Sequence, residues 1–459
     1  MKRHFDSIVV GAGQAGIPLA GRLSKEGYSV ALIERERLGG ACVNTGCTPT
    51  KTMIASAYVA RAVQRAQEYG VFVPGDAHID IRAVVTRKNQ VVAKSQRSLD
   101  QWVAGMTGCS LIKGVARFNG ERAMSVNGET FTADRVFLNV GARPTIPPMP
   151  GISESRIFTS DTILEINELP RHLAVVGGGY IGLEFGQMFR RFGSKISIVE
   201  MEPRLLAHED RDVSEAVTGV LVDEGIDIRT GAECIAFSQG NSSPIVHFSE
   251  GGRQQSIDAS HVLVAVGRTP NTDSLNLGSA MIDVDARGFI VVNEQLETSA
   301  ESVWALGDCN GRGAFTHTAY NDYEIVASNL LDGKERRVCE RIQAHALYID
   351  PPLAQIGMTE VQVKASGKKA LMATRSMDRV GRAVEKGESK GFMKVLVDAE
   401  TRTIMGASIL GVGADEAIHG MLDIMYAGMP YTAITQAVHI HPTVSELIPT
   451  LLEDLKPLQ

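Results

Sequence analysis

The sequence repeats one pattern of apolar and polar positions in two places. An apolar run over residues 7–10 precedes a glycine-rich turn, and an amphipathic stretch to about Lys25 then leads to a second apolar run over residues 29–33. The same order recurs 166 residues later, with apolar runs over residues 173–176 and 195–199. Uninterrupted apolar runs of this length are typical of buried parallel strands, and the stretch between them has the spacing of a helix. The pattern therefore predicts two β-α-β units.

The remaining segments predict a mixture of helices and strands. Residues 54–101 predict one long helix, and residues 103–150 predict short strands separated by turns. Residues 302–306 predict a short strand that leads to Asp308 and is followed by a helix. From about Arg341 onwards strands alternate with helices, a pattern that is typical of a separate α+β domain.

Composition limits the classes of protein to which the chain can belong. Its 459 residues suggest about three domains at roughly 150 residues each. Hydrophobic residues make up 44% of the chain and charged residues 22%, which excludes a disordered chain. A net charge of −7 without a basic block argues against nucleic acid as a partner. No apolar run reaches the ~18 residues of a membrane span, and the N-terminus lacks a signal-peptide pattern. We therefore expect a cytoplasmic protein that binds no membrane.

Glycines gather in the turns of the two repeated units. The chain has 46 glycines, about 10% of its residues against roughly 7% in average proteins. Both turns have the form G-x-G-x-x-G and are followed, 18 residues after the third glycine, by an acid: Gly11, Gly13, Gly16 and Glu34 in the first unit, and Gly177, Gly179, Gly182 and Glu200 in the second. Such glycines let the backbone approach a pyrophosphate, and the helix N-terminus favours its negative charge. The repeated motif predicts two dinucleotide-binding sites.

Two dinucleotide sites in one chain predict two cofactors that exchange electrons, with flavin and nicotinamide as the obvious pair. Glu34 and Glu200 are expected to accept hydrogen bonds from ribose hydroxyls. The Glu200 carboxylate would repel the additional phosphate of NADP, so NADH is the predicted reductant. Arg204 lies close to Glu200 in the sequence and keeps NADPH as an alternative.

Two of the six cysteines lie close together in the sequence. Cys42 and Cys47 have Gly46 between them and Pro49 just after them. Residues five apart on a regular helix are displaced by about 7.5 Å along the axis, beyond the ~6.8 Å limit for the α-carbons of a disulfide. A disulfide here requires a distorted segment, which the glycine and the proline favour, and a strained disulfide would be labile and catalytic. The alternative is a pair of reduced packing cysteines, as we expect for the other four.

Together these segments resemble the class I pyridine nucleotide-disulfide oxidoreductases, the flavoprotein family that includes dihydrolipoamide dehydrogenase, glutathione reductase and mercuric reductase. The resemblance covers nearly the whole chain. Besides the glycine turns it rests on four motifs: Cys42-x4-Cys47 with Lys51, Gly267-Arg268-x-Pro270-Asn271, Gly307-Asp308, and His441-Pro442-Thr443-x-x-Glu446.

The resemblance implies an α/β fold with two doubly wound dinucleotide-binding domains and a C-terminal α+β dimerisation domain. The expected FAD-binding domain is discontinuous and consists of residues 1–150 and 272–335. The expected NAD(P)-binding domain is residues 151–271, and the expected dimerisation domain is residues 340–459. The family implies a homodimer whose active sites are shared between the subunits.

The resemblance also implies roles for the thiols and for one histidine. Cys47 would be the thiol against the flavin, and Cys42 the thiol that meets the substrate. His441 of a second subunit would be the acid–base for Cys42, oriented by Glu446. General chemistry agrees, since a dithiol site needs a base with a pKa near neutral, and a carboxylate on the second imidazole nitrogen selects its tautomer. His439 is the nearest competitor but lacks the following proline and the spaced glutamate.

Further positions are assigned to cofactors by the same resemblance. Lys51 and Glu184 would pair near the flavin, and Tyr180 would cover the flavin until nicotinamide displaces it. The other expected cofactor contacts, beyond the two glycine turns and their acids, are Gly141 and Asp308 for FAD, and Gly267 and Arg268 for the nicotinamide nucleotide. No metal site is predicted.

Local segments around the cysteines and the C-terminal histidine resemble most closely the mercuric reductase-like branch, which includes a bacterial flavoprotein copper(II) reductase. The sequence has no N-terminal C-x-x-C segment and no cysteine pair in residues 449–459, so efficient mercury reduction is not expected. The predicted function is FAD-dependent transfer of electrons from NAD(P)H, through a Cys42–Cys47 disulfide, to a metal ion or a disulfide. The alternatives are dihydrolipoamide dehydrogenase or another small-disulfide reductase, and a flavin-bearing redox sensor or diaphorase without dithiol turnover.

Overall fold

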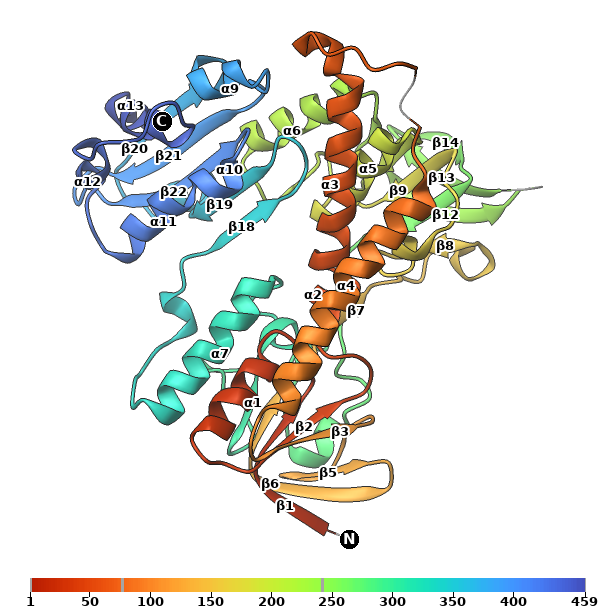
Figure 1. Ribbon diagram of the computed structural model, residues 1–459, viewed down its shortest axis with the longest axis vertical. Helices are drawn as coiled ribbons and strands as arrows, with labels where there is room; N and C mark the ends of the chain where they lie inside the picture. The colour runs from red at the N-terminus through yellow and green to blue at the C-terminus, as the bar shows by residue number, and fades with distance from the viewer. Residues whose placement is uncertain (1, 76–77, 241–242, 459) are drawn as a thin grey trace.

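The computed structural model of the protein describes residues 2–75, 78–240 and 243–458. Three main sheets build the molecule (Figure 1). The strands of the first sheet come mainly from the N-terminal part of the chain, those of the second from the middle, and those of the third from the C-terminal part. Buried aliphatic and aromatic side chains form a large cluster at each sheet, and the cluster at the second sheet also includes Leu347, Leu353 and Leu410 of the third.

The first sheet has seven strands in the order β3-β2-β1-β6-β5-β4, with β17 beside β6. Its strands are β1 (Lys2–Val10), β2 (Val30–Glu34), β3 (Cys109–Lys113), β4 (Arg117–Gly120), β5 (Ala123–Val126), β6 (Glu129–Leu138) and β17 (Val303–Ala305). Strand β1 is parallel to both neighbours, so that Ser7 lies opposite Val30 on one side and Arg135 on the other. Every residue of β2 is buried, as the apolar run predicted. Helices α1 (Gly16–Lys25) and α7 (Thr316–Leu331) complete this part.

The second sheet is parallel throughout, in the order β11-β10-β9-β15-β8. Its strands are β8 (Ile157–Phe158), β9 (His172–Val176), β10 (Lys195–Val199), β11 (Asp227–Arg229) and β15 (His261–Val264). Helices α5 (Tyr180–Phe192) and α6 (Arg211–Asp223) connect three of these strands. The order β9-α5-β10 repeats β1-α1-β2, which confirms the two predicted β-α-β units.

Two smaller sheets accompany the second sheet. The three-stranded antiparallel one is formed by β12 (Glu233–Gln239), β13 (Pro244–Glu250) and β14 (Arg253–Asp258), and β7 (Ala142–Pro144) pairs with β16 (Arg268–Pro270). The three-stranded sheet was not predicted. Strand β14 is almost entirely exposed and β12 has one buried residue, so this part of the sequence shows little apolar periodicity.

The third sheet is antiparallel, in the order β18-β19-β22-β21-β20-β23. Its strands are β18 (Ala344–Leu347), β19 (Leu353–Gly357), β20 (Ala370–Ser376), β21 (Phe392–Asp398), β22 (Ile404–Leu410) and β23 (Lys456–Pro457). Short helices accompany it: α8 (Glu360–Ala365), α9 (Gly381–Glu385), α10 (Ala414–Ala417), α11 (His419–Tyr426), α12 (Thr432–Thr435) and α13 (Ile448–Glu453). The architecture confirms the predicted class, an α/β fold with two doubly wound units and a C-terminal α+β unit. The first sheet differs from the second in that β4 and β5 pair antiparallel at its edge.

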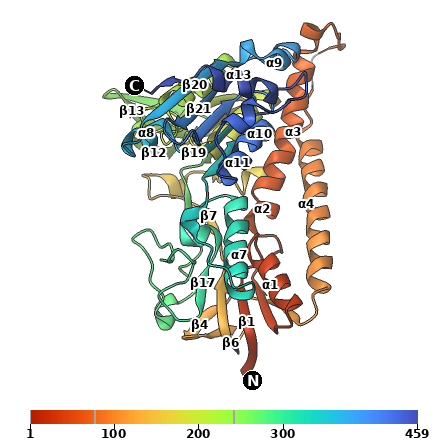
Figure 2. The same ribbon diagram turned by 90° about the vertical axis from the view of Figure 1, so that its left-hand side faces the viewer.

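The prediction of one long helix over residues 54–101 is wrong. The structure has two helices here, α3 (Cys47–Gln64) and α4 (Ile81–Ala104), which lie side by side (Figure 2). The chain turns at Gly70, which has a positive φ of 74°, and Asp80 caps α4 by accepting hydrogen bonds from two backbone N–H groups. Positions 76 and 77 lie outside the described residues.

Candidate active site

Both glycine turns open into one cleft, which has a volume of about 1760 Å³ and is also lined by Cys42 and Cys47. Pockets for one small molecule usually measure roughly 300–1,000 Å³. The cleft is therefore large enough for two extended ligands that meet near the cysteines.

The first turn is held by close backbone packing. A Cβ atom on Gly16 would lie 2.0 Å from the carbonyl oxygen of Gly11, so the third glycine is required for α1 to pack on β1. Glu34 ends β2, and its two oxygens accept the backbone N–H groups of Ala12 and Glu36 at 2.8 Å each. The acid therefore fixes the turn, and its carboxylate lies in the wall of the cleft.

The second turn repeats this geometry. A Cβ atom on Gly182 would lie 2.1 Å from the carbonyl oxygen of Gly177, and Glu200 accepts the N–H groups of Gly178 at 2.5 Å and Glu202 at 2.8 Å. A Cβ atom on Gly179 would meet nothing within 4 Å. The backbone of this glycine is thus open to a ligand that approaches the start of α5.

Asn139 was not predicted as a site residue, yet it joins three parts of the first unit. Its side-chain oxygen accepts the N–H of Gly16 at 2.9 Å, and its amide nitrogen donates to the carbonyl oxygen of Leu306 at 2.9 Å. It directly follows the buried end of β6, and a polar residue at the carboxyl end of a buried strand is the signal that could have identified it.

The helix that carries the two cysteines is interrupted between them. Helix α2 (Gly40–Asn44) contains Cys42, α3 begins at Cys47, and Thr45 and Gly46 separate them with non-helical backbone angles. This is the distorted segment that a contact between the two thiols requires. Both cysteines are free thiols in the structure.

The thiol of Cys47 is the more acidic of the pair. The hydrogen bond from Cys42 lowers the pKa of Cys47 to about 6, helped by the Thr316 hydroxyl and the positive charge of Lys51 and opposed by burial. The Thr316 Oγ1 lies 3.4 Å from the Cys47 Sγ. The pKa of Cys42 is raised, because its S–H group donates a hydrogen bond to Cys47 and because the side chain is buried. The surroundings therefore favour the thiolate on Cys47 over a thiolate on Cys42.

Lys51 and Glu184 connect the cysteine helix to the second unit. The Lys51 Nζ lies 2.7 Å from Glu184 Oε2 and 4.8 Å from the centre of the Tyr348 ring, while Glu184 Oε1 accepts the backbone N–H of Tyr348 at 3.0 Å. All three side chains line the cleft.

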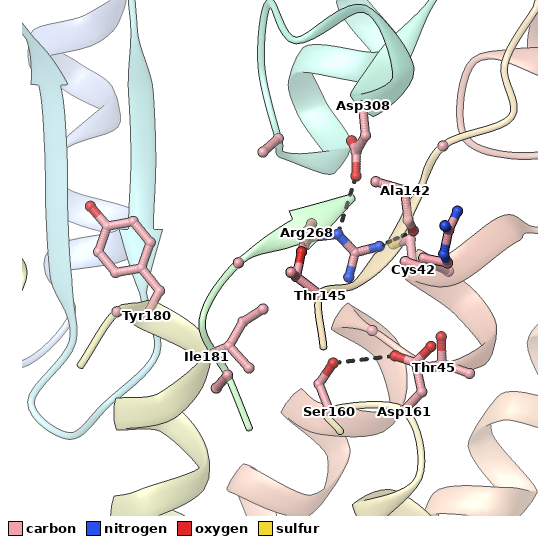
Figure 3. Close-up of a pocket in the computed structure, with 18 of the residues that line it drawn as sticks. Cys42, Thr45, Ala142, Thr145, Ser160, Asp161, Tyr180, Ile181, Arg268 and Asp308 are labelled. Carbon is pink, nitrogen blue, oxygen red and sulfur yellow. Dashed lines mark hydrogen bonds and ion pairs between the residues drawn. The ribbon is translucent and has the colours of Figure 1, made fainter. Parts of the chain in front are cut away.

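An acidic and a basic side chain, Asp308 and Arg268, meet in the wall of the cleft (Figure 3). Arg268 donates to the carbonyl oxygen of Ala142, and its Nε lies 3.6 Å from Asp308 Oδ2. Burial raises the pKa of Asp308 despite this positive charge. Arg268, assigned to the nicotinamide nucleotide from sequence, thus contacts the residue assigned to FAD.

Ser160 and Asp161 also line the cleft and were not predicted. The Ser160 hydroxyl donates to Asp161 at 3.2 Å, and burial raises the pKa of Asp161. The run of hydroxyl and acidic residues over 159–162 was a usable signal, because such residues after a short apolar stretch often end a strand at a ligand site. Gly141 and Gly267 lie in the wall of the same cleft.

Tyr180 is the first residue of α5, and its ring lies beside the third sheet at one side of the cleft (Figure 3). Its hydroxyl donates a hydrogen bond to Glu209, whose carboxylate also contacts His345 Nε2 at 2.8 Å. Neither Glu209 nor His345 was predicted, because each comes from a segment without a recognisable motif.

His441 and Glu446 pair with each other but are absent from the wall of the cleft in this chain. The Nδ1 of His441 lies 2.9 Å from Glu446 Oε2, and the His441 side chain is 80% exposed. The competitor, His439, instead faces the carbonyl oxygen of Ala437 at 3.2 Å. The structure thus orients the His441 ring through a carboxylate while leaving its other nitrogen on an exposed surface.

In residues 2–75, 78–240 and 243–458, no group of three or more His, Cys, Asp or Glu side chains is arranged to hold a metal ion. No helix among these residues is long and apolar enough to cross a membrane.

Comparison with known proteins gives concordant results. Residues 5–322 match the family model for pyridine nucleotide-disulphide oxidoreductases, and residues 343–452 match the model for the dimerisation domain of these proteins. The chain is 34% identical to the probable pyridine nucleotide-disulfide oxidoreductase RclA of Escherichia coli strain K12, over 98% of this chain and 99% of the relative. It is 31% identical to mercuric reductase of Staphylococcus aureus, over 96% and 81%.

A solved structure agrees with these matches. The copper(II) complex of the HOCl-induced flavoprotein disulfide reductase RclA from Escherichia coli superposes with a TM-score of 0.88 at 34% identity, over 97% of this chain and 99% of that one.

Proposed function

The chain belongs to the pyridine nucleotide-disulphide oxidoreductase family, and on this premise we propose that it is a flavoenzyme that uses NADH to reduce a Cys42–Cys47 disulfide and passes the electrons to a metal ion. The observation that carries the proposal is the position of the two thiols. Cys42 and Cys47 lie on either side of the break between α2 and α3, in the wall of the cleft where both glycine turns open. The lowered pKa of Cys47 agrees with this role.

The residues around the first turn fit FAD. The N-terminus of α1 faces the cleft, the Glu34 carboxylate lies in its wall, and Asp308 offers a partly buried carboxylate to a polyol chain. Gly141, in the same wall, allows close approach of a ligand. When bound there, the flavin would accept a hydride from reduced nicotinamide and deliver two electrons to the disulfide.

The chain's own groups would then control protons and charge. Reduction of the disulfide takes two electrons and two protons to give two thiols, and Cys47 would release its proton because its pKa is about 6. Cys42 keeps its proton until a base removes it, which is the role we propose for His441 of a second copy of the chain. Lys51 stabilises the Cys47 thiolate, and Glu184 holds Lys51 in place.

NADH is the proposed reductant because Arg204, the cation near Glu200 in the sequence, is turned away from the cleft. The Arg204 guanidinium donates to the carbonyl oxygens of Ala207 at 2.7 Å and Glu209 at 3.0 Å, and Arg204 does not line the cleft. Glu200 does line it. The additional phosphate of NADPH would therefore face the Glu200 carboxylate, and Arg204 would not balance the negative charge of the phosphate.

A metal ion is the proposed acceptor on the strength of the chain's similarity to proteins named mercuric reductase and to a reductase solved as a copper(II) complex. Thiolates favour soft ions such as Hg(II) and copper. A dithiol releases two electrons on oxidation, so one NADH would reduce two equivalents of Cu(II) to Cu(I). A small disulfide is the second candidate, since the same two thiols perform disulfide exchange.

We also propose the domain division and the assembly. Residues 1–150 with 272–335 would form the FAD-binding domain, residues 151–271 the NAD(P)-binding domain and residues 340–459 the dimerisation domain. Support for this comes from β17, which pairs with β6 in the first sheet, and from the dimerisation-domain match.

A panel of acceptors tests the proposed function. The purified holoenzyme would be assayed with NADH and with NADPH against Cu(II), Hg(II), glutathione disulfide and lipoamide. We expect turnover with Cu(II) at a stoichiometry of one NADH to two Cu(II), and a lower KM for NADH than for NADPH.

The matched variants are Cys42→Ser and Cys339→Ser, the second at an exposed cysteine outside the cleft. C42S should lose acceptor reduction while its flavin is still reduced by NADH, and C339S should behave as the parent. Full activity of C42S toward every acceptor would show that the protein acts as a plain diaphorase.

A further inference from the structure

Four side chains from separate segments meet beside the second glycine turn. They are Tyr180 at the start of α5, Glu209 just before α6, His345 on β18, and Phe315 just before α7. The Tyr180 ring lies 5.4 Å from the His345 ring and 6.2 Å from the Phe315 ring, and His345 stacks on Phe315 with an angle of 5° between their planes. The cluster thus fixes Tyr180 from two sides.

Glu209 is the common acceptor in this cluster. Its side chain is only 4% exposed, and its Oε1 contacts both the Tyr180 hydroxyl and the His345 Nε2, the latter at 2.8 Å. Burial raises the pKa of Glu209, but the hydrogen bond and charge of His345 and the hydrogen bond from Tyr180 outweigh burial and lower this pKa overall. Burial and the charge of Glu209 raise the pKa of Tyr180. The bond is therefore one from a neutral phenol to a carboxylate.

The second carboxylate oxygen of Glu209 is buried and has no hydrogen-bond partner within the part of the chain that the structure describes. A buried carboxylate with one unpaired oxygen depends on the donors that reach the other oxygen. Tyr180 and His345 supply them. If either donor were lost, the Glu209 carboxylate would be less well fixed, and its hydrogen bond with the remaining donor would be weaker.

The segment that carries Glu209 is itself anchored to the third sheet. The adjacent residue, Asp210, contacts the buried ammonium of Lys394 on β21 at 2.8 Å and accepts the backbone N–H of Glu360 at 3.0 Å. Because His345 also belongs to the third sheet, the position of the Tyr180 hydroxyl is set by that sheet and not only by the second unit.

From this geometry we infer that Glu209 and His345 are positioning residues that hold the Tyr180 hydroxyl in place across the cleft, an arrangement that we call the latch. A nicotinamide nucleotide must break the Tyr180–Glu209 hydrogen bond in order to bind. The inference rests on the proposed function, in which Tyr180 is displaced by the nicotinamide. The family resemblance assigns to Tyr180 the role of covering the flavin. The latch adds a role for Glu209 and His345, which hold the Tyr180 hydroxyl in place.

The latch makes nucleotide binding weaker than the cleft alone would allow. A net hydrogen bond to a charged group corresponds to a factor of roughly 10–100 in an equilibrium constant, and the released hydroxyl recovers part of this by bonding to water. Removing the hydroxyl while keeping the ring should therefore tighten nucleotide binding by about 5- to 20-fold.

The test measures the affinity of oxidised holoenzyme for NAD⁺ by titration calorimetry, together with kcat and KM for NADH. The variants are Tyr180→Phe, Glu209→Gln, His345→Phe and His345→Gln. Tyr58→Phe is the matched control, because the Tyr58 hydroxyl donates to Glu388 at 2.7 Å and Tyr58 does not line the cleft.

We expect Y180F, E209Q and H345F to bind NAD⁺ about 5- to 20-fold more tightly than the parent, with a lower KM. H345Q, whose amide N–H can still donate to Glu209, should return the affinity to within twofold of the parent, and Y58F should leave it unchanged. Rescue by glutamine separates a positioning role from simple packing.

Equal affinities of Y180F and the parent would overturn the latch and leave the proposed function intact. No binding of NAD⁺ or NADP⁺ to the parent holoenzyme would instead overturn the proposed function. If E209Q or H345F fails to fold, Y180F alone still decides the question, because it retains the ring and every partner of Glu209 except one.

Discussion

The Lys51 Nζ lies 2.7 Å from Glu184 Oε2, and this ion pair joins α3, the helix that begins at Cys47, to α5, the helix that begins at the second glycine turn. Glu184 is buried, whereas Lys51 is about one-third exposed and reaches the cleft. The acidity of the thiol is thus coupled to a residue of the second unit.

Replacing Lys51 by methionine should make Cys47 less acidic. The positive charge of Lys51 helps to lower the pKa of Cys47, so its loss should move the midpoint of thiolate formation upward from about pH 6 by roughly half to one pH unit. The measurement is the pH dependence of iodoacetamide labelling of Cys47 in the reduced protein, followed by mass spectrometry. Lys51→Arg keeps the charge and should keep the midpoint, and an unchanged midpoint in K51M would contradict the assignment.

Removing the hydrogen bond from Cys42 should have the larger effect on the same titration. That bond is the first cause of the lowered pKa of Cys47. Because the lowered pKa belongs to Cys47, labelling of the parent protein should be slow below pH 6, rise through about pH 6 and level off above pH 7. In Cys42→Ala the rise should shift toward the ordinary range of a thiol, roughly pH 8.5. A C42A profile that coincides with the parent profile would show that Cys42 donates no such bond.

An alanine at Gly179 should weaken the nicotinamide site without unfolding the protein. The backbone φ of Gly179 is −85°, which alanine adopts without strain, and its Cβ would enter open space at the cleft. We expect normal flavin content, an unchanged melting temperature and a KM for NADH at least about 10-fold higher, since a methyl group would occupy the position of closest approach. Gly219→Ala, where a Cβ also meets nothing within 4 Å but lies outside the cleft, is the control. A normal KM for NADH in G179A would show that Gly179 does not lie where the nicotinamide nucleotide binds.

Subunit mixing should show whether His441 serves a neighbouring chain. The ring is 80% exposed and does not line the cleft of its own chain. Cys42→Ser and His441→Ala homodimers should both be strongly impaired in acceptor reduction. After unfolding and refolding as an equimolar mixture, half of the dimers are mixed, and one of their two sites has both groups intact. Recovery to about one quarter of parent activity is expected, and no recovery would place the acid–base within one chain.

The parts of the site that sequence could predict are those with fixed local spacing. A Cβ atom on Gly16 would lie 2.0 Å from the carbonyl oxygen of Gly11, and one on Gly182 would lie 2.1 Å from that of Gly177, so no other residue type fits at these two positions. The break between Cys42 and Cys47 follows from the same kind of local constraint, because only a distorted helix lets the two thiols meet.

The parts that sequence did not predict depend on contacts between distant segments. Glu209 and His345 are 136 positions apart, and nothing in the local sequence of either residue indicates the other. Asp161 approaches the cleft from the segment between β8 and β9 of the second sheet. The long helix over residues 54–101 was wrong for a different reason, because the amphipathic pattern continues on both sides of a turn that includes Gly70 and Gly75, both with positive φ.

Strand β17 has a consequence for the order in which the protein is made. It completes the first sheet beside β6, and just after it the carbonyl oxygen of Leu306 accepts a hydrogen bond from Asn139, whose side-chain oxygen accepts the N–H of Gly16 in the first glycine turn. The first sheet therefore stays incomplete until about residue 306 has left the ribosome, whereas every strand of the second sheet lies between Ile157 and Val264. The dinucleotide site that comes first in the sequence is thus the last of the two to be finished during synthesis.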